Sequence, residues 1–143
     1  MPGTDHILSK AFVVASNVTT AISLGQALVM ATNVQVPSVG QPAQVAPAGI
    51  GANAFCIGVA AENIDLIKIA TGKAFIAVNV LGVAKVIADG VIAIGAPVMN
   101  STTTAGFVKP GGTAGSFLIG YALEAAAASG DIIDVLLTPG AKF

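Results

Sequence analysis

Short apolar runs, separated by glycine, proline, asparagine or serine, follow one another along most of this chain. Within the runs, Val, Ile and Thr alternate with small or polar residues, and this period of two is typical of strands with one buried face. The pattern predicts a mainly β fold, a compact β-sandwich or open barrel in a single domain. The expected strands cover residues 12–14, 28–31, 34–36, 55–60, 74–78, 83–87, 97–99, 106–109, 117–121 and 132–138.

A helical signal is confined to one alanine-rich stretch. Residues 123–129 have the sequence Leu-Glu-Ala-Ala-Ala-Ala-Ser, alanine has the highest helix propensity, and Gly130 would end the helix. Residues 60–63 would form a shorter counterpart. We therefore expect one or two very short helices in an otherwise β domain.

Two motifs occur twice, in the same order. The segment ISLGQALVM at 22–30 returns as IAIGAPVM at 92–99, and FCIGVAAE at 55–62 returns as FLIGYALE at 117–124. Repeated motifs mark repeated structure, and two copies favour a pseudo-symmetric domain over a solenoid. The repetition points to a surface and an assembly rather than to a pocket.

The motifs also suggest how the chain is organised. We expect an extended N-terminal arm at 1–10, which combines proline, glycine and mixed charge, followed by a β-rich domain at 11–143. The two related halves of this domain are expected at about 11–80 and 83–138. A proline- and glycine-rich loop at 37–51 makes the first half the longer one.

Composition favours an assembly over a free monomer. Hydrophobic residues make up 55% of the chain and charged residues only 9%, against about 25% charged residues in ordinary soluble domains. Such a monomer would expose much apolar surface, and large apolar patches mark interaction sites. We infer that the protein works as an oligomer or docked on something larger.

The same composition argues against nucleic acids and membranes as partners. The chain has no arginine and a net charge of −1, whereas recognition of phosphates and bases relies on arginine. The uncharged stretch 11–61 is interrupted by Asn, Gln and Pro before the roughly 20 apolar residues of a membrane span accumulate. The first residues lack the basic and apolar regions of a signal peptide, so we expect a soluble protein.

Candidate chemical groups are few and isolated. Cys56 lies between Phe55 and Ile57 and is expected to be a buried small hydrophobe. His6, beside Asp5 in the arm, lacks a rigidly held partner for acid–base catalysis. One histidine and one cysteine are too few for a metal site, so we expect no metal and no cofactor.

Two pairs of acidic residues have structural interpretations. Glu62 and Glu124 occupy equivalent positions in the two motif copies, which raises the idea of a carboxylate pair. As acids at the start of short helical segments, they would instead stabilise the helix N-terminus. Asp131 and Asp134 are too sparse for calcium and are expected as strand-edge charges that discourage pairing with other chains.

Motifs typical of enzymes fail in their context. Residues 49–54 match the pattern G-x-G-x-x-A, but no strand precedes them and a strand, not a helix, is expected to follow. Asn17 and Asn100 begin glycosylation sequons, which carry little weight without a secretory signal. The sequence has no nucleophile elbow and no P-loop, so we do not expect an enzyme.

The second half combines four short motifs in a fixed order. IAIGAPVM at 92–99 is followed by GFV at 106–108, FLIGYA at 117–122 and GDIIDVLL at 130–137. In this order, in chain length and in its scarcity of charge, the sequence resembles the head decoration, or capsid cement, proteins of tailed bacteriophages. The resemblance covers about residues 10–138.

This resemblance implies a β-sandwich or β-tulip-like domain that forms a homotrimer. The trimer would bind the major capsid protein on the outer surface of an icosahedral shell and stabilise that shell, after synthesis in the cytoplasm of the bacterial host. The family has no catalytic residues to transfer. Its N-terminal segment commonly reaches across the capsid or a neighbouring subunit, which would place an interface at Thr4, Asp5, His6, Ile7 and Leu8.

Two alternatives stay open. The first is another β-rich oligomeric module, such as a tail or fibre domain or a carbohydrate-binding domain. Sugar binding usually requires exposed aromatic side chains, but Tyr121 is the sole tyrosine and tryptophan is absent. The second is an enzyme whose acid–base chemistry would rest on scattered carboxylates.

Overall fold

The computed structural model describes residues 8–31, 43–50, 55–111, 114–138 and 141. Strands dominate this part of the chain, and one short helix interrupts them. The elements are β1 (Leu8–Val14), β2 (Ala27–Met30), β3 (Gln44–Pro47), β4 (Cys56–Ala60), α1 (Leu66–Ala70), β5 (Phe75–Ile87), β6 (Pro97–Asn100), β7 (Val108–Pro110), β8 (Leu118–Ala122) and β9 (Ile132–Leu137).

The strands form two small barrels that share β5. In the first barrel, the order β1–β3–β2–β4–β5 is closed by the pairing of β1 with β5. In the second barrel, the C-terminal part of β5 pairs with β9, which is followed by β8, β6 and β7. A parallel bridge between Ala88 and Val108 brings β7 back to the end of β5. The mainly β, single-domain fold expected from the sequence is confirmed.

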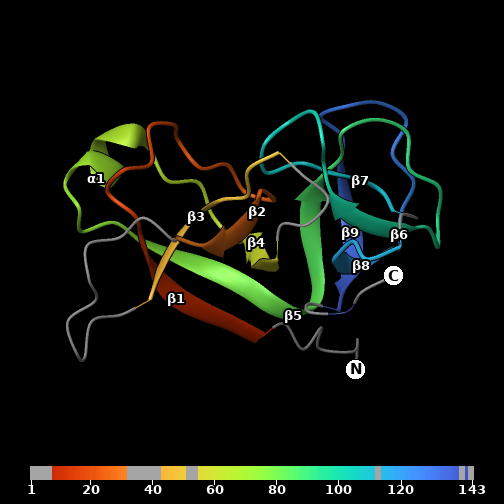
Figure 1. Cartoon of the computed structure of the whole chain (residues 1–143), viewed down its shortest axis with the longest axis horizontal. Coiled ribbons are helices and arrows are strands. Elements are labelled where there is room, and N and C mark those ends of the chain that lie inside the picture. Colours follow the sequence, from red (N-terminus) through yellow and green to blue (C-terminus); the bar gives the residue numbers. More distant parts are fainter. Residues whose placement is uncertain (1–7, 32–42, 51–54, 112–113, 139–140, 142–143) are drawn as a thin grey trace, which may run out of the picture.

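The long strand β5 changes partners at a glycine. Leu81 is the last β5 residue aligned with β1, and Gly82 is the first aligned with β9. Gly82 has φ of 94°, a left-handed conformation that side chains disfavour. Figure 1 shows β5 running from the group of β1–β4 to the group of β6–β9, with a sharp bend between them.

The two copies of the glycine motif make the same backbone contacts. Gly25 donates its N–H to the Ala60 carbonyl at 2.9 Å, and Gly95 donates to the Ala122 carbonyl at 2.7 Å. Strand registers around them also match, so positions in the two barrels can be paired. The equivalent pairs are Ile22/Ile92, Leu24/Ile94, Gly25/Gly95, Ala27/Pro97, Val59/Tyr121, Ile64/Ala126 and Asn79/Leu136.

Buried apolar side chains fill both barrels and join them. One cluster lies inside the first barrel and includes Leu28 and Ile76. The other fills the second barrel, yet it also contains Ala27, Cys56 and Val59 from β2 and β4 of the first barrel. The second core therefore extends across the contact between the barrels, which binds them into one domain.

The helix lies in a different place from the one that alanine content predicts. The prediction for residues 123–129 is wrong, and so is its counterpart at 60–63, because α1 is at Leu66–Ala70. Within 123–129, Ala126 exchanges two backbone hydrogen bonds with Ile92, at 2.9 and 3.0 Å, which ties this stretch to a strand-like partner. Asp65 caps α1 by accepting the Lys68 N–H at 2.8 Å, an N-terminal signal that the alanine run lacks.

Strand boundaries show three further differences. The first strand was expected at 12–14, but β1 begins at Leu8 and thus includes residues 8–10 of the expected arm. The sequence pattern misses β3, Gln44–Pro47, which lies within the stretch 37–51 that was expected to be a proline- and glycine-rich loop. It also divides β5 into 74–78 and 83–87, although one strand runs through both. The expected strand at 34–36 lies outside the described residues.

Candidate functional site

Of the five interface residues expected in the arm, only Leu8 is among the described residues. Thr4, Asp5, His6 and Ile7 lie outside them. Leu8 is the first residue of β1, where it is aligned with Leu81 and is 55% exposed. The described chain therefore begins with an apolar side chain on an exposed strand.

Glu62 and Glu124 support strands instead of starting helices. Glu62 accepts the backbone N–H of Ala77 at 2.9 Å, and Glu124 accepts that of Asp134 at 3.0 Å. The helix-start interpretation is wrong for both residues. Because each carboxylate is engaged with the backbone of its own barrel, the equivalence reflects the repeated architecture and not a catalytic pair.

Cys56 is buried, as expected. Burial raises the pKa of its thiol to about 12. Only a negligible fraction is then thiolate near neutral pH, and the thiolate is the nucleophilic form. Cys56 therefore belongs to the packing of the core.

The two aspartates near β9 have different roles. Asp131 accepts the backbone N–H groups of Ala127 and Ala128 at 2.8 and 3.0 Å, so it organises the turn before β9 and is not a strand-edge charge. Asp134 is not a strand-edge charge either, because it lies within β9, which is paired on both sides. It forms an ion pair with Lys85 of β5 at 2.8 Å. The hydrogen bond to Asp134 raises the pKa of the Lys85 ammonium.

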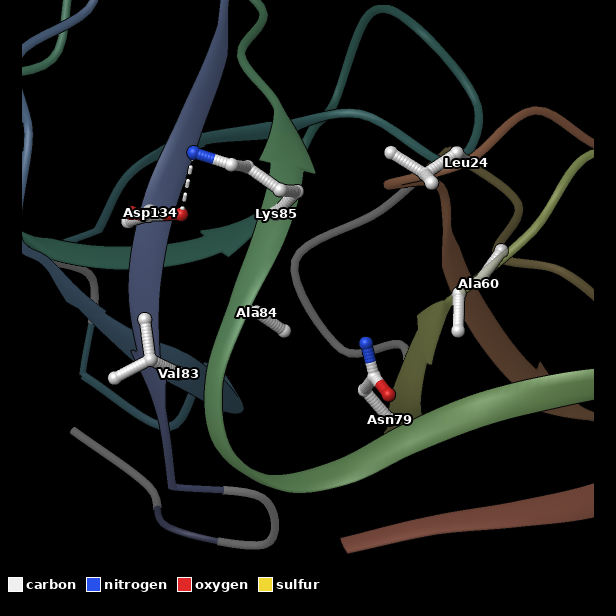
Figure 2. Close-up of a pocket in the computed structure, with 8 residues that line it drawn as sticks. Leu24, Ala60, Asn79, Val83, Ala84, Lys85 and Asp134 are labelled. Atoms are coloured by element: carbon white, nitrogen blue, oxygen red, sulfur yellow. Dashed lines mark ion pairs between the residues drawn. The ribbon is translucent and has the colours of Figure 1, made fainter. Parts of the chain in front are cut away.

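A cleft of about 250 Å³ lies where β5 bends between the barrels. Figure 2 shows Leu24 and Ala60 on one side of the cleft, and the ion pair between Lys85 and Asp134 on the other. Lys85 and Asp134 are the charged residues that line the cleft, and they form an ion pair with each other. The other lining residues are Ala61, Asn79, Val83 and Ala84. The cleft therefore offers neither a nucleophile nor an acid–base pair aimed at a ligand.

A cluster of hydroxyl groups surrounds Asp89, just after the end of β5. Its carboxylate accepts hydrogen bonds from Ser101 and Thr103, from Thr104 at 3.1 Å, and from Ser129 at 3.2 Å. The hydrogen bonds from Ser101 and Thr103 contribute most to lowering the pKa of Asp89 to about 2. The sequence pattern did not predict this cluster, although the run Ser-Thr-Thr-Thr at 101–104 supplies three of its four hydroxyl groups.

We expect Asp89→Asn to remove an acid-sensitive part of the stability. Because folding lowers this pKa from 3.8 to about 2, the contribution is present above the unfolded-state pKa and is lost as pH falls from about 5 to 2. At neutral pH the variant should lose roughly 1 kcal/mol, a value reduced for solvent screening at this partly exposed site. Urea unfolding between pH 2 and 7 measures both effects. An equally steep acid loss in the variant would contradict the assignment.

The neighbouring Asn100 links the two barrels. It is fully buried, and its Nδ2 donates to the Gly49 carbonyl at 2.5 Å. A glycan could not be attached to this side chain in the folded protein, so the sequon at Asn100 has no role there. The nearby 49–54 segment makes a loop contact through Gly49, and residues 51–54 lie outside the described residues.

An apolar face of the second barrel is exposed. Pro97, Tyr121, Leu136 and Val83 are aligned side by side on β6, β8, β9 and β5. Tyr121 is 44% exposed and Leu136 is 42% exposed, and Ile94, in the turn before β6, is 71% exposed. We call Ile94, Gly95, Pro97, Tyr121 and Leu136 the open face.

The described residues also contain neither metal-binding groups nor membrane-spanning helices. In the described part of the chain, no group of three or more His, Cys, Asp or Glu side chains could hold a metal ion. Among the same residues, no helix is long and apolar enough to cross a membrane.

The described chain thus forms two fused barrels with an exposed apolar face. The family model described as phage cement protein matches residues 38–137, so the chain belongs to the phage cement protein family. It is thus a phage structural protein associated with the capsid of the virion. The resemblance seen in the sequence is confirmed.

A solved structure shares the fold over nearly the whole chain. It is the N base of the head fibre gp8.5 of bacteriophage phi29, with a TM-score of 0.63 and 16% sequence identity. The similarity covers 92% of this chain and 95% of the other. No curated protein matches the sequence.

Proposed function

We propose that this protein binds the outer surface of an icosahedral phage capsid as a homotrimer and stabilises the shell without catalysing a reaction. The match of the cement-protein family model over residues 38–137 carries the proposal. Its partners are the major capsid protein and further copies of itself.

The geometry suits such a role. Closing both sheets into barrels pairs most strand edges, which limits uncontrolled association, while the open face offers apolar surface for specific contacts. A trimer presents its capsid-binding surface three times, and avidity can exceed the affinity of one copy by about a hundredfold or more. Weak contacts from a small, sparsely charged domain can then brace a shell.

The test is addition of purified protein to undecorated, expanded capsids. We expect saturable binding by cosedimentation and a higher temperature of DNA release in decorated heads. Absence of binding, or binding without added heat resistance, would contradict the proposed function. The same assay on a variant lacking residues 1–7, which leaves β1 intact, tests the proposal that Thr4–Ile7 contribute to the interface; equal affinity would reject that part. The variant Leu8→Ser tests the remaining residue of the proposed segment in the same way.

A second candidate function is the base of a head fibre. The structural similarity to the phi29 head-fibre base covers 92% of this chain, and both candidates would place the domain on a phage head. Electron cryomicroscopy of virions separates them. Density that ends at the barrels indicates a cement protein, whereas a fibre continuing outward from them indicates a fibre base.

A further inference from the structure

The two barrels differ in how the same face is covered. In the first barrel, Ala27 and Val59 are fully buried because the second barrel packs on them. The Gly25 carbonyl accepts the N–H of Ile87 at 3.2 Å, and the Ala27 N–H donates to the Gly106 carbonyl at 2.7 Å. This face of the first barrel is thus an interface within the chain.

The equivalent face of the second barrel is the open face, and nothing in the described chain covers it. Gly25 is buried against Ile87, but a Cβ added at its equivalent, Gly95, would meet no atom within 4 Å. The face is nevertheless apolar: Tyr121 stands where the first barrel has Val59, and Leu136 stands where it has Asn79. Exposed apolar surface of this kind marks an interaction site.

The end of β5, which covers the face of the first barrel, has an equivalent strand in the first barrel. Within the chain, the first barrel's face meets the end of β5, where Gly25 approaches Ile87 and the Lys85 carbonyl. The first-barrel equivalent of this part of β5 is β1, since Ala15 and Asp89 follow the two strands and donate to Val45 and Val108 in the same way, at 2.9 and 2.7 Å. Ala11, the equivalent of Lys85, is exposed, as are residues 8–10 before it, whereas Val13, the equivalent of Ile87, is only 8% exposed.

We propose that the open face is a subunit interface occupied by the first barrel of a second copy, which it meets at β1. Within one copy, the second barrel packs on the first. The proposed contact repeats this packing between the second barrel of one copy and the first barrel of the next. It is a head-to-tail contact, which closes into a ring when the rotation allows. The inference rests on the homotrimer of the proposed function and names the surfaces that build it.

A difference between the two barrels limits the hydrogen bonds that the subunit contact can form. Pro97 replaces Ala27 at the equivalent position and has no N–H, so the hydrogen bond that Ala27 makes to Gly106 cannot be repeated between copies. The Val13 N–H is also engaged, with the Ala43 carbonyl at 3.4 Å. The subunit contact should therefore consist mainly of side-chain packing, not of an added strand.

The first test is the oligomeric state of Tyr121→Glu and Leu136→Glu, measured by sedimentation velocity. Both side chains are exposed, so circular dichroism and thermal unfolding should show folded barrels. We expect the wild type to be a trimer and both variants to dissociate at least about tenfold more readily. The matched control is Ile67→Glu on α1, at a site that is 81% exposed, and it should stay trimeric. Trimers of wild-type stability in both variants, or a monomeric wild type, would overturn the proposal.

The second test is cysteine cross-linking between Ile94→Cys and Ala11→Cys, the equivalents of Leu24 and Lys85 that line the cleft. Under mild oxidation, a mixture of the two single variants should give disulfide-linked dimers, and each variant alone should give none. The natural Cys56 is buried and should not form disulfides in this experiment. Dimers of Ile94→Cys alone would show a symmetric contact and refute the head-to-tail arrangement.

The outcomes separate this inference from the proposed function. A wild-type trimer that fails to bind capsids, together with the disulfide between positions 94 and 11, would reject the cement function and retain the interface. Capsid binding that persists in folded Tyr121→Glu and Leu136→Glu trimers would support the function and reject the interface.

Discussion

Gly120→Ala is expected to destabilise the protein by about 3 kcal/mol, at the upper end of the range for overpacked sites. A Cβ at this position would overlap the Leu136 carbonyl oxygen and lie 2.7 Å from Val135 Cγ1. Both obstacles belong to β9, which is paired on both sides, so neither can move away cheaply. Thermal unfolding should show a midpoint lower by roughly 10 °C.

Two further alanine variants make this prediction specific. Gly58→Ala repeats the test at the equivalent position of the first barrel, where a Cβ would overlap the Asn79 carbonyl oxygen, and should be similarly damaging. Gly49→Ala is the control, because no atom lies within 4 Å of its added Cβ. If Gly120→Ala unfolds at the wild-type temperature, the close approach of β8 to β9 is not what requires glycine.

Val59→Glu is expected to prevent folding at 37 °C. Val59 is fully buried where the barrels meet, so the variant would place a carboxylate without a partner in an apolar core, at a cost of about 3–5 kcal/mol. That cost is comparable with the whole stability of many domains. Soluble yield and circular dichroism measure the outcome.

The matched control is the same substitution at the equivalent position, Tyr121→Glu, which should fold because Tyr121 is 44% exposed. The same change to glutamate would then prevent folding at Val59 and weaken the trimer at Tyr121. A folded, soluble Val59→Glu protein would show that the second barrel does not cover this face as tightly as the structure indicates.

The local pattern predicted most strands because side-chain alternation depends on one strand and the face it buries. It failed for the helix. Alanine content favours residues 123–129, but the hydrogen bonds of Ala126 with Ile92 hold that stretch extended, while the Asp65 cap forms α1 elsewhere. Propensity is a weak preference that tertiary contacts override.

The candidate sites show the same division. Burial of Cys56 follows from its apolar neighbours and was predicted correctly. The roles of Glu62 and Asp131 were not, since their backbone partners are set by turns whose geometry no short motif encodes. The hydroxyl cluster of Asp89 combines groups up to 40 residues apart, and separations of that length leave no periodic signal.

The sequence alone determined the β class, the doubled motifs and the resemblance to phage cement proteins, because each is written in short patterns of apolar residues and glycine. Tertiary structure decided which copy of the repeated face is buried. Val59 and Tyr121 occupy equivalent positions in equivalent strands, yet the second barrel covers only the first of them. Local patterns specify a strand and its faces, whereas packing between distant segments decides which face meets solvent or a partner.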